Sequence, residues 1–471
     1  MSQQHQPNIV FIMSDDHAAH AIGAYGSLVN ETPHIDRIGR EGVVLDNCFC
    51  TNSICSPSRA TILTGTYSHV NGVKSINDSF DGRQETVQSL MRDAGYQTAI
   101  VGKWHLGHGG NADPTGFDYW AILPDQGLYH DPDMFVMGQR TQFEGYATDI
   151  ITDLSLDWLE HRDRDRPFVL FLHHKAPHRN WQPDEKHAHM YDDVDIPYPE
   201  TFDDDYSNRS RAAREAKMRI DDLDRVDLKG DPPEGLSGED LKRWRYQRYM
   251  KDYLACVASV DDNVGRVLDY LDAEGIADDT VVIYTSDQGF FLGDHGWFDK
   301  RFMYEESLRM PFLMRYPREI LAESRSASVV TNVDFASLFL DYGGLESTDR
   351  MQGRSFRGIV AGEPEPDDWP QAMYYRYWMH REIHHNTVAH YGIRTRRYKL
   401  IYYYGDPLDT SGSFGPPTEP EWELFDLEED PQEMRSVYDD PAYADIVRKL
   451  TDDMHRLQAM VGDEPFVPTT P

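Results

Sequence analysis

The chain has 471 residues, which is enough for a large buried core and too many for one ordinary domain. Its hydrophobic content of 39% and aromatic content of 12% are typical of a globular protein and exclude a disordered chain. The net charge of −35 argues against binding to nucleic acid or to an anionic membrane surface, and no run approaches the roughly 20 apolar residues of a membrane span.

The N-terminus and the cysteines bear on the compartment. The first residues lack the basic start and apolar segment of a signal peptide, so we expect a cytoplasmic protein, or a periplasmic or secreted one whose leader was removed. Cys48, Cys50, Cys55 and Cys256 do not resemble a disulfide framework. No Cys-x-x-Cys motif occurs, so zinc binding by thiolates is not expected.

Residues 8–13 are continuously apolar and predict a strand buried on both faces, as in a parallel sheet. Asp15 and Asp16 follow at its carboxyl end, where ligands bind in open α/β sheets. Two adjacent carboxylates repel one another unless a cation bridges them, and oxygen ligands suit Ca²⁺ or Mg²⁺. The alternative is a turn in which an aspartate caps the next helix.

Residues 55–65 carry the most informative motif, Cys-Ser-Pro-Ser-Arg-Ala-Thr-Ile-Leu-Thr-Gly. Pro57 fits the first turn of a helix, and Gly65 can end it. Cys55 would then lie just before a helix N-terminus, where free N–H groups favour negative charge, and Arg59 can share that face. The alternative is a buried structural cysteine beside a helix cap, which is the commoner role of a lone cysteine.

This run resembles the signature of the sulfatase family, Cys-x-Pro-x-Arg followed by a small-residue turn and Thr-Gly. The resemblance implies that a dedicated maturation enzyme oxidises Cys55 to formylglycine (3-oxoalanine), an aldehyde whose hydrate attacks sulfur. It also implies that residue 55 contacts a bound metal. An unmodified Cys55 would leave a folded but inactive protein.

The next predicted strand, residues 96–101, leads into Gly-Lys-Trp-His. In a strand-like segment Lys103 and His105 point to one side, and a cation beside a titratable imidazole suits anion binding and proton transfer. The alternative is an exposed strand end with a solvated lysine. The block resembles one found in sulfatases, which favours the catalytic interpretation.

Residues 168–172 predict a third core strand, and the segment that follows resembles a sulfatase block in which a histidine comes after a proline. That position is His178. We interpret His173 and His174 as local structure.

Residues 183–240 are rich in Asp, Glu, Arg and Pro and predict a surface insertion, with an exposed, mixed-charge helix within residues 209–224. The insertion would form either a rim of the pocket or a solvated excursion. Residues 246–273 predict a long helix with an apolar stripe, and Cys256 lies near that stripe, so we expect it in the core.

Residues 280–284 predict a fourth buried strand, ending in Ser-Asp-Gln-Gly. This end resembles a sulfatase block, and Asp287 and Gln288 would join Asp15 and Asp16 as oxygen ligands from two strands. Such a set suits Ca²⁺ better than zinc, with Mg²⁺ as the alternative.

Beyond residue 370 the pattern alternates as in antiparallel strands, and residues 446–460 predict a closing helix. The resemblance implies an α/β fold, an alkaline-phosphatase-like sandwich with a central, mostly parallel sheet and a smaller C-terminal α+β subdomain with an antiparallel sheet. We place the catalytic domain at 1–370 and the subdomain at 371–471.

Five C-terminal side chains are candidates for binding sugar hydroxyls or carboxylates. They are His380, His384, His385, His390 and Arg394. Packing within the subdomain explains them about equally well.

The resemblance assigns a role to each catalytic residue. Arg59, Lys103 and Lys300 are the three cations that, together with the metal, would hold the sulfate oxygens. Asp287 would take the proton of the attacking hydroxyl, and His178, alone or together with Lys300, would protonate the leaving alcohol. His105 would remove the proton of the second hydroxyl, after which the aldehyde reforms and sulfate leaves.

Three functions remain open. The blocks look most like those of carbohydrate sulfatases such as N-acetylglucosamine-6-sulfatase, which would make a sulfated saccharide the substrate. The second is an aryl or alkyl sulfatase, or a phosphomonoester or phosphonate hydrolase, on the same scaffold. The third is a non-catalytic binder of sulfated glycans, which is disfavoured because a competent residue stands at every catalytic position.

Overall fold

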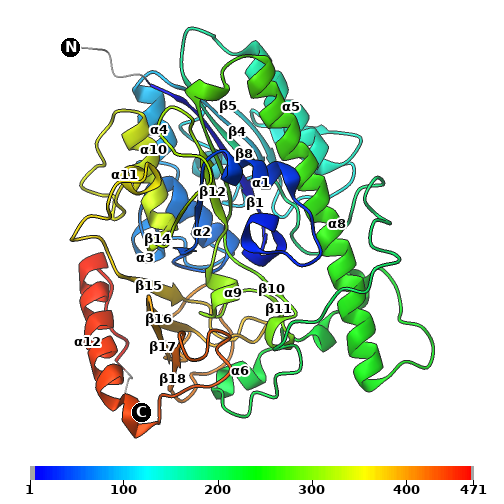
Figure 1. Ribbon diagram of the computed structural model, residues 1–471, viewed down its shortest axis with the longest axis vertical. Coiled ribbons are helices and arrows are strands. Elements are labelled where there is room, and N and C mark those ends of the chain that lie inside the picture. The colour runs from blue at the N-terminus through cyan, green and yellow to red at the C-terminus, as the bar shows by residue number, and fades with distance from the viewer. Residues whose placement is uncertain (1–5, 468–471) are drawn as a thin grey trace.

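Strand β1 (Asn8–Ser14) lies at the centre of a ten-stranded sheet in the computed structural model, which describes residues 6–467 (Figure 1). Its two neighbours, β8 and β9, both run parallel to it. The strand order is β13-β2-β12-β9-β1-β8-β4-β5-β6-β7. The bounds of the other nine strands are β2 (Val43–Leu45), β4 (Gln97–Lys103), β5 (Tyr119–Leu123), β6 (Asp133–Val136), β7 (Gln139–Gln142), β8 (Phe168–His173), β9 (Thr280–Ser286), β12 (Phe312–Arg315) and β13 (Ser324–Ser326).

The two faces of this sheet are buried in two separate cores because successive side chains of a strand point to opposite sides. Val10 and Ile12 of β1 pack in one core, whereas Phe11 and Met13 pack in the other. The first core also contains residues of α1 (Pro33–Arg40), α5 (Ala147–His161) and α8 (Gly238–Ala273). The second contains residues of α2 (Cys55–Thr64), α4 (Val87–Asp93) and α10 (Phe335–Tyr342). Helices therefore cover both faces of the sheet.

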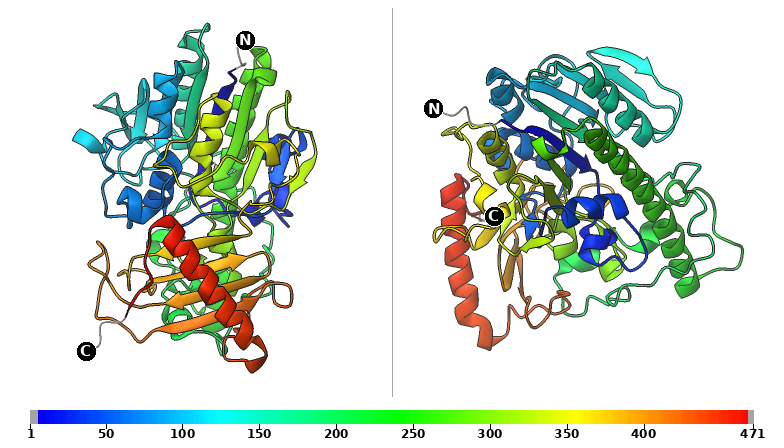
Figure 2. Two further views of the ribbon diagram at one scale, coloured as in Figure 1. Left: turned by 90° about the vertical axis from the view of Figure 1, so that its left-hand side faces the viewer. Right: turned by 45° about the horizontal axis from the view of Figure 1, so that its top comes forward.

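A second, antiparallel sheet follows towards the C-terminus, with the order β15 (Ala372–Tyr377), β16 (His390–Thr395), β17 (Tyr398–Tyr403) and β18 (Glu421–Asp426). Helix α12 (Ala444–Val461) lies across one face (Figure 2), and Leu450 and Met454 pack there. The opposite face, including Tyr375, shares a core with the large sheet. The expected fold class, a mostly parallel central sheet with a smaller antiparallel sheet, is confirmed.

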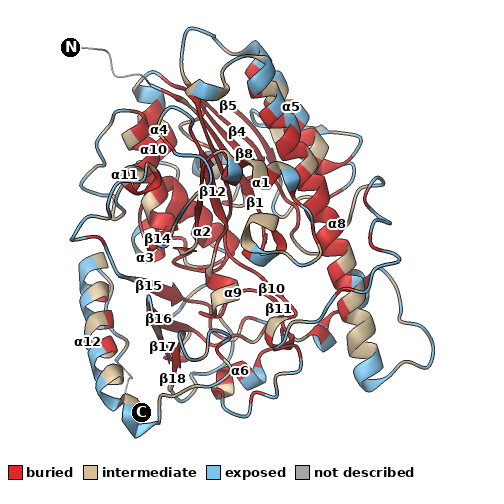
Figure 3. Cartoon of the chain, viewed as in Figure 1, coloured by how far each residue is buried: buried red, intermediate tan, exposed pale blue. Residues whose placement is uncertain are grey.

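The segment at residues 183–240, expected as either a rim of the pocket or a solvated excursion, is partly buried. The expected helix within residues 209–224 is wrong in extent, since only α6 (Arg211–Glu215) and a 3-10 turn (Ile220–Asp222) form there. Many of its apolar side chains are buried (Figure 3), among them Met218 and Ile220. The backbone N–H of Ser210 donates to the buried Glu423 carboxylate at 2.7 Å. The segment, which leads into the long helix α8 in the chain, therefore contacts β18, the edge strand of the small sheet.

The remaining elements are short. They are α3 (Ser68–Asn71), α7 (Arg225–Leu228), α9 (Glu305–Leu308), α11 (Arg357–Val360), β3 (Cys48–Phe49), β10 (Phe291–Leu292), β11 (Phe298–Asp299), β14 (Val330–Thr331) and 3-10 turns at Ala19–Ala21, Gly23–Tyr25, Gly110–Ala112, Ala277–Asp279, Asp294–Gly296, Asn332–Asp334 and Pro441–Tyr443. Within residues 6–467, none of the helices combines the length and apolar character needed to span a membrane.

Candidate active site

Three carboxylates meet at the carboxyl edge of the large sheet. β1 and β9 are paired in parallel with Ser14 opposite Ser286, so Asp15 and Asp287 leave the sheet side by side. Oxygen atoms of Asp15, Asp16 and Asp287 lie within 4.8 Å of one another, and all three side chains are buried. Asp16 has a left-handed backbone (φ 65°), which directs the chain sharply away from the strand.

Burial and mutual repulsion set the charges of these carboxyls. Burial raises the pKa of Asp16 to about 8, and Asp15 and Asp287 add to the rise although Lys300 opposes it. Burial and the Asp15 charge likewise raise the pKa of Asp287. Burial also pushes the pKa of Asp15 upwards, but nearby cations, above all Lys103, outweigh it and hold that pKa well below its usual range.

Gln288 completes an oxygen-rich set. Its Nε2 donates to Asp16 Oδ1 at 2.5 Å, whereas its Oε1 is buried without a hydrogen-bond partner among the described residues. A buried amide oxygen left unpaired beside three carboxylates is costly unless it coordinates a cation. The donor set contains the hard oxygen ligands that Ca²⁺ and Mg²⁺ bind, so these residues fit such an ion.

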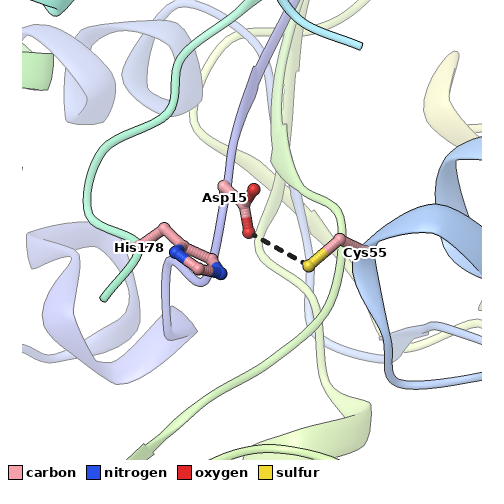
Figure 4. Close-up of side chains that lie close together, drawn as sticks. All are labelled: Asp15, Cys55 and His178. Atoms are coloured by element: carbon pink, nitrogen blue, oxygen red, sulfur yellow. Dashed lines mark hydrogen bonds between the residues drawn. The ribbon is translucent and has the colours of Figure 1, made fainter. Parts of the chain in front are cut away.

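Cys55 is the first residue of α2, one position further into the helix than the sequence suggested. Its Sγ lies 3.5 Å from Asp15 Oδ1, and the His178 ring approaches the same point (Figure 4). Burial, followed by the Asp15 charge, raises the pKa of the Cys55 thiol, so the unmodified side chain is neutral. Gly65 ends α2 with a left-handed conformation (φ 63°), as the motif predicted.

Arg59 is the buried cation that links the pieces of the site. Its Nε donates to Asp287 Oδ2 at 3.0 Å, and its Nη2 lies 3.4 Å from Asp15 Oδ2. Its Nη1 donates to the carbonyl oxygen of Lys103 at 2.6 Å. One guanidinium thus fixes the ends of β1, β4 and β9 relative to α2.

Two buried lysines that are far apart in the sequence, Lys103 and Lys300, contact the carboxylates. The Lys103 ammonium forms an ion pair with Asp15 and donates to Gln126 Oε1 at 2.5 Å. The Lys300 ammonium donates to Asp16 Oδ1 at 2.6 Å and Oδ2 at 2.8 Å. The structure therefore brings together three carboxylates and the three cations that the sequence analysis assigned to sulfate.

The two candidate histidines have different surroundings. His178 hydrogen-bonds through Nδ1 to the Arg179 carbonyl at 2.7 Å, which leaves Nε2 facing Asp16 Oδ2 at 3.6 Å. His105 follows the end of β4 with a left-handed backbone (φ 54°), so strand alternation does not place it, and its buried Nδ1 has no partner among the described residues. Burial, with the Lys103 charge, holds the pKa of both rings well below the usual value.

His173 and His174, at and just after the end of β8, are both buried. His173 Nδ1 lies 3.2 Å from the Lys103 carbonyl oxygen. Burial lowers the pKa of His174 to about 3. His173 Nδ1 also lies 3.4 Å from Arg59 Nη1, and the interpretation of both histidines as local structure stays a prediction.

The C-terminal candidates do not converge. His390 is enclosed by tyrosines and accepts from the Met303 N–H at 3.1 Å, and His380 is buried with Nε2 3.1 Å from the Pro416 carbonyl oxygen. His384 is exposed, and Arg394 is ion-paired with Glu305. These four are not brought to the carboxylates.

His385 is the fifth candidate, and it reaches the neighbourhood of Lys300. Its Nε2 lies 3.2 Å from Asp299 Oδ2, and its Nδ1 lies 2.7 Å from Glu382 Oε2. His385 therefore connects the small sheet to the segment that carries Lys300.

Three site residues were missed by the sequence analysis. Asp299 and Arg301 flank Lys300 with left-handed backbones (φ 75° and 92°), and Arg301 Nε donates to Asp299 Oδ1 at 3.0 Å. Such conformations are uncommon outside glycine and cluster at functional sites. Gln126 contacts Lys103 from the loop after β5. The signals available were the charged run around Lys300 and the Pro-Asp-Gln-Gly turn after a strand.

Two protein-family models and a curated relative match this chain. The sulfatase family model matches residues 7–345, and the model of the N-sulphoglucosamine sulphohydrolase C-terminal region matches residues 293–460. An N-acetylglucosamine-6-O-sulfatase of Bacteroides thetaiotaomicron is 42% identical, over 97% of this chain and 87% of that protein.

Solved structures match as well. A protein bound to its substrate D-glucosamine-2-N,6-O-disulfate has a TM-score of 0.91 and 41% identity, covering 97% of this chain and 98% of that one. A phosphonate monoester hydrolase of Agrobacterium radiobacter has a TM-score of 0.74 with 20% identity, covering 97% of each chain, which shows the shared fold alone.

Proposed function

The chain belongs to the sulfatase family, and from this premise we propose that it hydrolyses the 6-O-sulfate ester of glucosamine residues in a sulfated saccharide. We further propose that Cys55 acts as formylglycine, made by a maturation enzyme, and that a divalent cation, Ca²⁺ in preference to Mg²⁺, is bound beside it. The observation that carries this proposal is that Cys55 contacts Asp15, which in turn is ion-paired with the buried cations Arg59 and Lys103.

Charge balance supports the cation. Asp15, Asp16 and Asp287 are already opposed by Arg59, Lys103 and Lys300. A sulfate ester brings a further negative charge, which the same three cations cannot hold while they neutralise the carboxylates.

The residues around the carboxylates also define where such an ion would be held. Asp15, Asp16, Asp287, the Gln288 amide oxygen and residue 55 would bind it, and its charge would assist ionisation of a hydroxyl at residue 55. Formylglycine supplies that hydroxyl, because its aldehyde is hydrated.

If a divalent cation neutralised the carboxylates, the chain's own cations would be available to hold the sulfate. Arg59, Lys103 and Lys300 are buried and lie around the carboxylates that neighbour Cys55. Their ammonium and guanidinium groups would bind the sulfate oxygens as charge redistributes during attack at sulfur. Together with a divalent cation, these fixed cations would give the strongly acidic protein a locally positive point of entry for an anion.

Proton transfer falls to the two histidines and Asp287. Because His178 donates from Nδ1 to a carbonyl, the free Nε2 of the neutral ring can take up a proton. An incoming anionic ester favours that protonated form, and Nε2–H then donates to the oxygen of the departing alcohol. Asp287 would accept the proton of the attacking hydroxyl, and His105, whose Nδ1 is unpaired, would accept that of the second hydroxyl.

The saccharide assignment rests on the two relatives named for sulfated glucosamine and on the groups beside Lys300. Asp299, Arg301 and His385 form a buried polar cluster there. A carboxylate and a guanidinium next to the sulfate position suit the hydroxyls and anionic substituents of an amino sugar. Of the five C-terminal candidates, we retain His385 in this role, acting through Asp299.

The test begins with the peptide that contains Cys55. Protein produced with the maturation enzyme should show a mass about 18 Da lower than the thiol form, since CH₂SH is replaced by CHO. That protein should release sulfate from N-acetylglucosamine-6-sulfate faster than from an aryl sulfate and should act slowly on an aryl phosphate. A thiol that persists beside the maturation enzyme, or a faster reaction with the phosphate ester, would contradict the proposal.

A further inference from the structure

The loop at residues 124–130 lies against the catalytic lysine because of the pairing of two strands. β4 and β5 are parallel, with Lys103 opposite Leu123, so the loop after β5 begins beside the end of β4. Gln126 turns back from this loop, and its Oε1 accepts a hydrogen bond from Lys103 Nζ at 2.5 Å. The Gln126 side chain is half-buried, whereas Leu128 in the same loop is 62% exposed.

The backbone of this loop is fixed by a tight turn. The Gly127 N–H donates to the Pro124 carbonyl oxygen at 2.8 Å, and Gly127 has φ 69°. A Cβ atom at Gly127 would lie 2.8 Å from Leu123 Cδ1, so only glycine fits without displacement. The turn therefore holds Gln126 in one position instead of leaving it on a free loop.

The same loop also contacts the segment that contains His178. The Tyr129 hydroxyl donates to the His178 carbonyl oxygen at 2.5 Å. The Tyr129 ring is buried and carries the Lys175 ammonium 4.7 Å from its centroid. One short loop thus contacts the side chain of Lys103 and the backbone of His178.

A neutral amide is the appropriate partner for Lys103. An ammonium has three donors and rotates freely, so its direction is set by the acceptors around it. Asp15 takes one N–H and Gln126 takes another, which leaves a third to be directed elsewhere. An amide oxygen orients the ammonium without cancelling its charge, whereas a carboxylate at the same place would compete with the sulfate.

We propose that Gln126 is a positioning residue of the reaction, which directs the Lys103 ammonium at the sulfate group. This inference rests on the proposed function, since it takes Lys103 to be a sulfate-binding cation. Gln126 acts through Lys103 and not on the sugar, so its contribution is independent of the leaving group.

The first experiment compares Gln126→Met and Gln126→Glu with wild-type enzyme on N-acetylglucosamine-6-sulfate and on 4-nitrophenyl sulfate. Gln126→Met should reduce kcat/KM about 10-fold, mainly through kcat, because a charged hydrogen bond is lost while Lys103 keeps its charge. Gln126→Glu should reduce kcat/KM about 100-fold, mainly through KM, because a new anion opposes the ester. For each variant, the loss in kcat/KM should be the same on the two substrates. The control variant Leu128→Ala should change neither kcat nor KM.

Two results would overturn the inference. Wild-type kinetics for Gln126→Glu would show that Lys103 does not depend on this contact. A loss confined to the sugar substrate would make Gln126 a sugar-binding residue.

A second measurement separates this inference from the proposed function. Binding of inorganic sulfate to Cys55→Ser protein, measured by calorimetry with and without Gln126→Glu, involves no turnover. About 10-fold weaker binding in the double variant supports the role of Gln126 even if the wild-type enzyme fails on both esters, in which case only the proposed function fails. Equal sulfate affinity in the two proteins overturns the inference.

Discussion

Two buried charged regions of the molecule use the same kinds of residue for different ends. At the strand-end site, Asp15, Asp16 and Asp287 crowd together. At the contact between the large domain and the small sheet, Lys399 lies 2.9 Å from Glu305 and 2.6 Å from Glu433, and Arg394 holds Glu305 through two 3.1 Å hydrogen bonds. We refer to these four residues, Glu305, Arg394, Lys399 and Glu433, as the interface cluster.

Each region contains one carboxyl whose pKa is lowered, Glu305 or Asp15, and at least one whose pKa burial raises, Glu433 or Asp16, so the regions differ in how their carboxylates and cations are arranged. Burial pushes the pKa of Glu305 upwards, but Arg394 and Lys399 outweigh it and hold that pKa below its usual value. Burial raises the pKa of Asp16 to about 8 although Lys300 touches both of its oxygens, because two other carboxylates lie beside it. In the interface cluster two carboxylates share two cations, which suits a contact that stabilises the fold, whereas in the strand-end site three carboxylates crowd within 4.8 Å of one another, which suits a place kept for a ligand.

Replacing the nucleophile should have the largest effect. Cys55→Ser should lower sulfate release by more than about 10³-fold, since a serine hydroxyl can attack sulfur but cannot eliminate sulfate by reforming an aldehyde. Thermal stability should stay close to that of the wild type, because the site keeps its charges. The matched control is Cys256→Ser, at a buried position of α8, and this variant should keep wild-type activity. Near wild-type turnover by Cys55→Ser would disprove the mechanism.

Removing divalent cations should affect the strand-end site alone. Exhaustive chelation should abolish activity, and Ca²⁺ should restore it. Calcium at a hundred times its dissociation constant should also raise the free energy of unfolding by about 2.7 kcal/mol, because it binds only the folded protein. In Asp16→Asn protein this stabilisation should shrink. Full activity in protein shown by elemental analysis to be free of metal would contradict the expectation.

Breaking the interface cluster should give the opposite result. Lys399→Met leaves Glu305 and Glu433 buried without their shared cation, so the free energy of unfolding should fall by about 3–5 kcal/mol. The kcat of the remaining folded enzyme should be unchanged. Lys449→Met, at an exposed position on α12, should alter neither quantity. If Lys399→Met lowered kcat without lowering stability, the distinction between the two regions would fail.

Acid should weaken the contact with the small sheet by a smaller amount. Burial pushes the pKa of Glu382 upwards, but the hydrogen bond from His385 and the Arg301 charge lower it to about 2. A depressed pKa stabilises the fold above the unfolded value of about 4.3 and loses that effect as the pH falls towards 2. Glu382→Gln should remove on the order of 2 kcal/mol of this pH dependence, measured by urea unfolding at pH 6 and pH 3. An unchanged pH profile would show that the contact does not depend on this carboxylate.

Local motifs account for most of the site. The strand followed by two aspartates, the helix at Cys55 and the lysine at the end of β4 were all recognisable because each depends on neighbouring residues in the chain. His105 shows the limit of this reasoning, because β4 ends at Lys103 and a left-handed backbone then redirects the chain.

Long-range packing decided the rest. His390 and His384 lie in one histidine-rich stretch, yet the small sheet buries the first among tyrosines and leaves the second in solvent. Residues 183–240 resembled a solvated insertion by composition, but scattered apolar side chains such as Met218 find partners far away in the chain. Charged composition alone does not reveal such partners.

The amino-acid sequence by itself determined the family, the fold class and the residues that lie near Cys55, because short local motifs with characteristic turn and strand preferences identify them. Only the tertiary structure decided that Gln126 touches Lys103, that His385 reaches Asp299 and that Lys399 is shared by two glutamates. The physical reason is that a hydrogen bond or an ion pair depends on atoms a few ångströms apart, and sheet pairing brings together residues whose separation along the chain gives no sign of it.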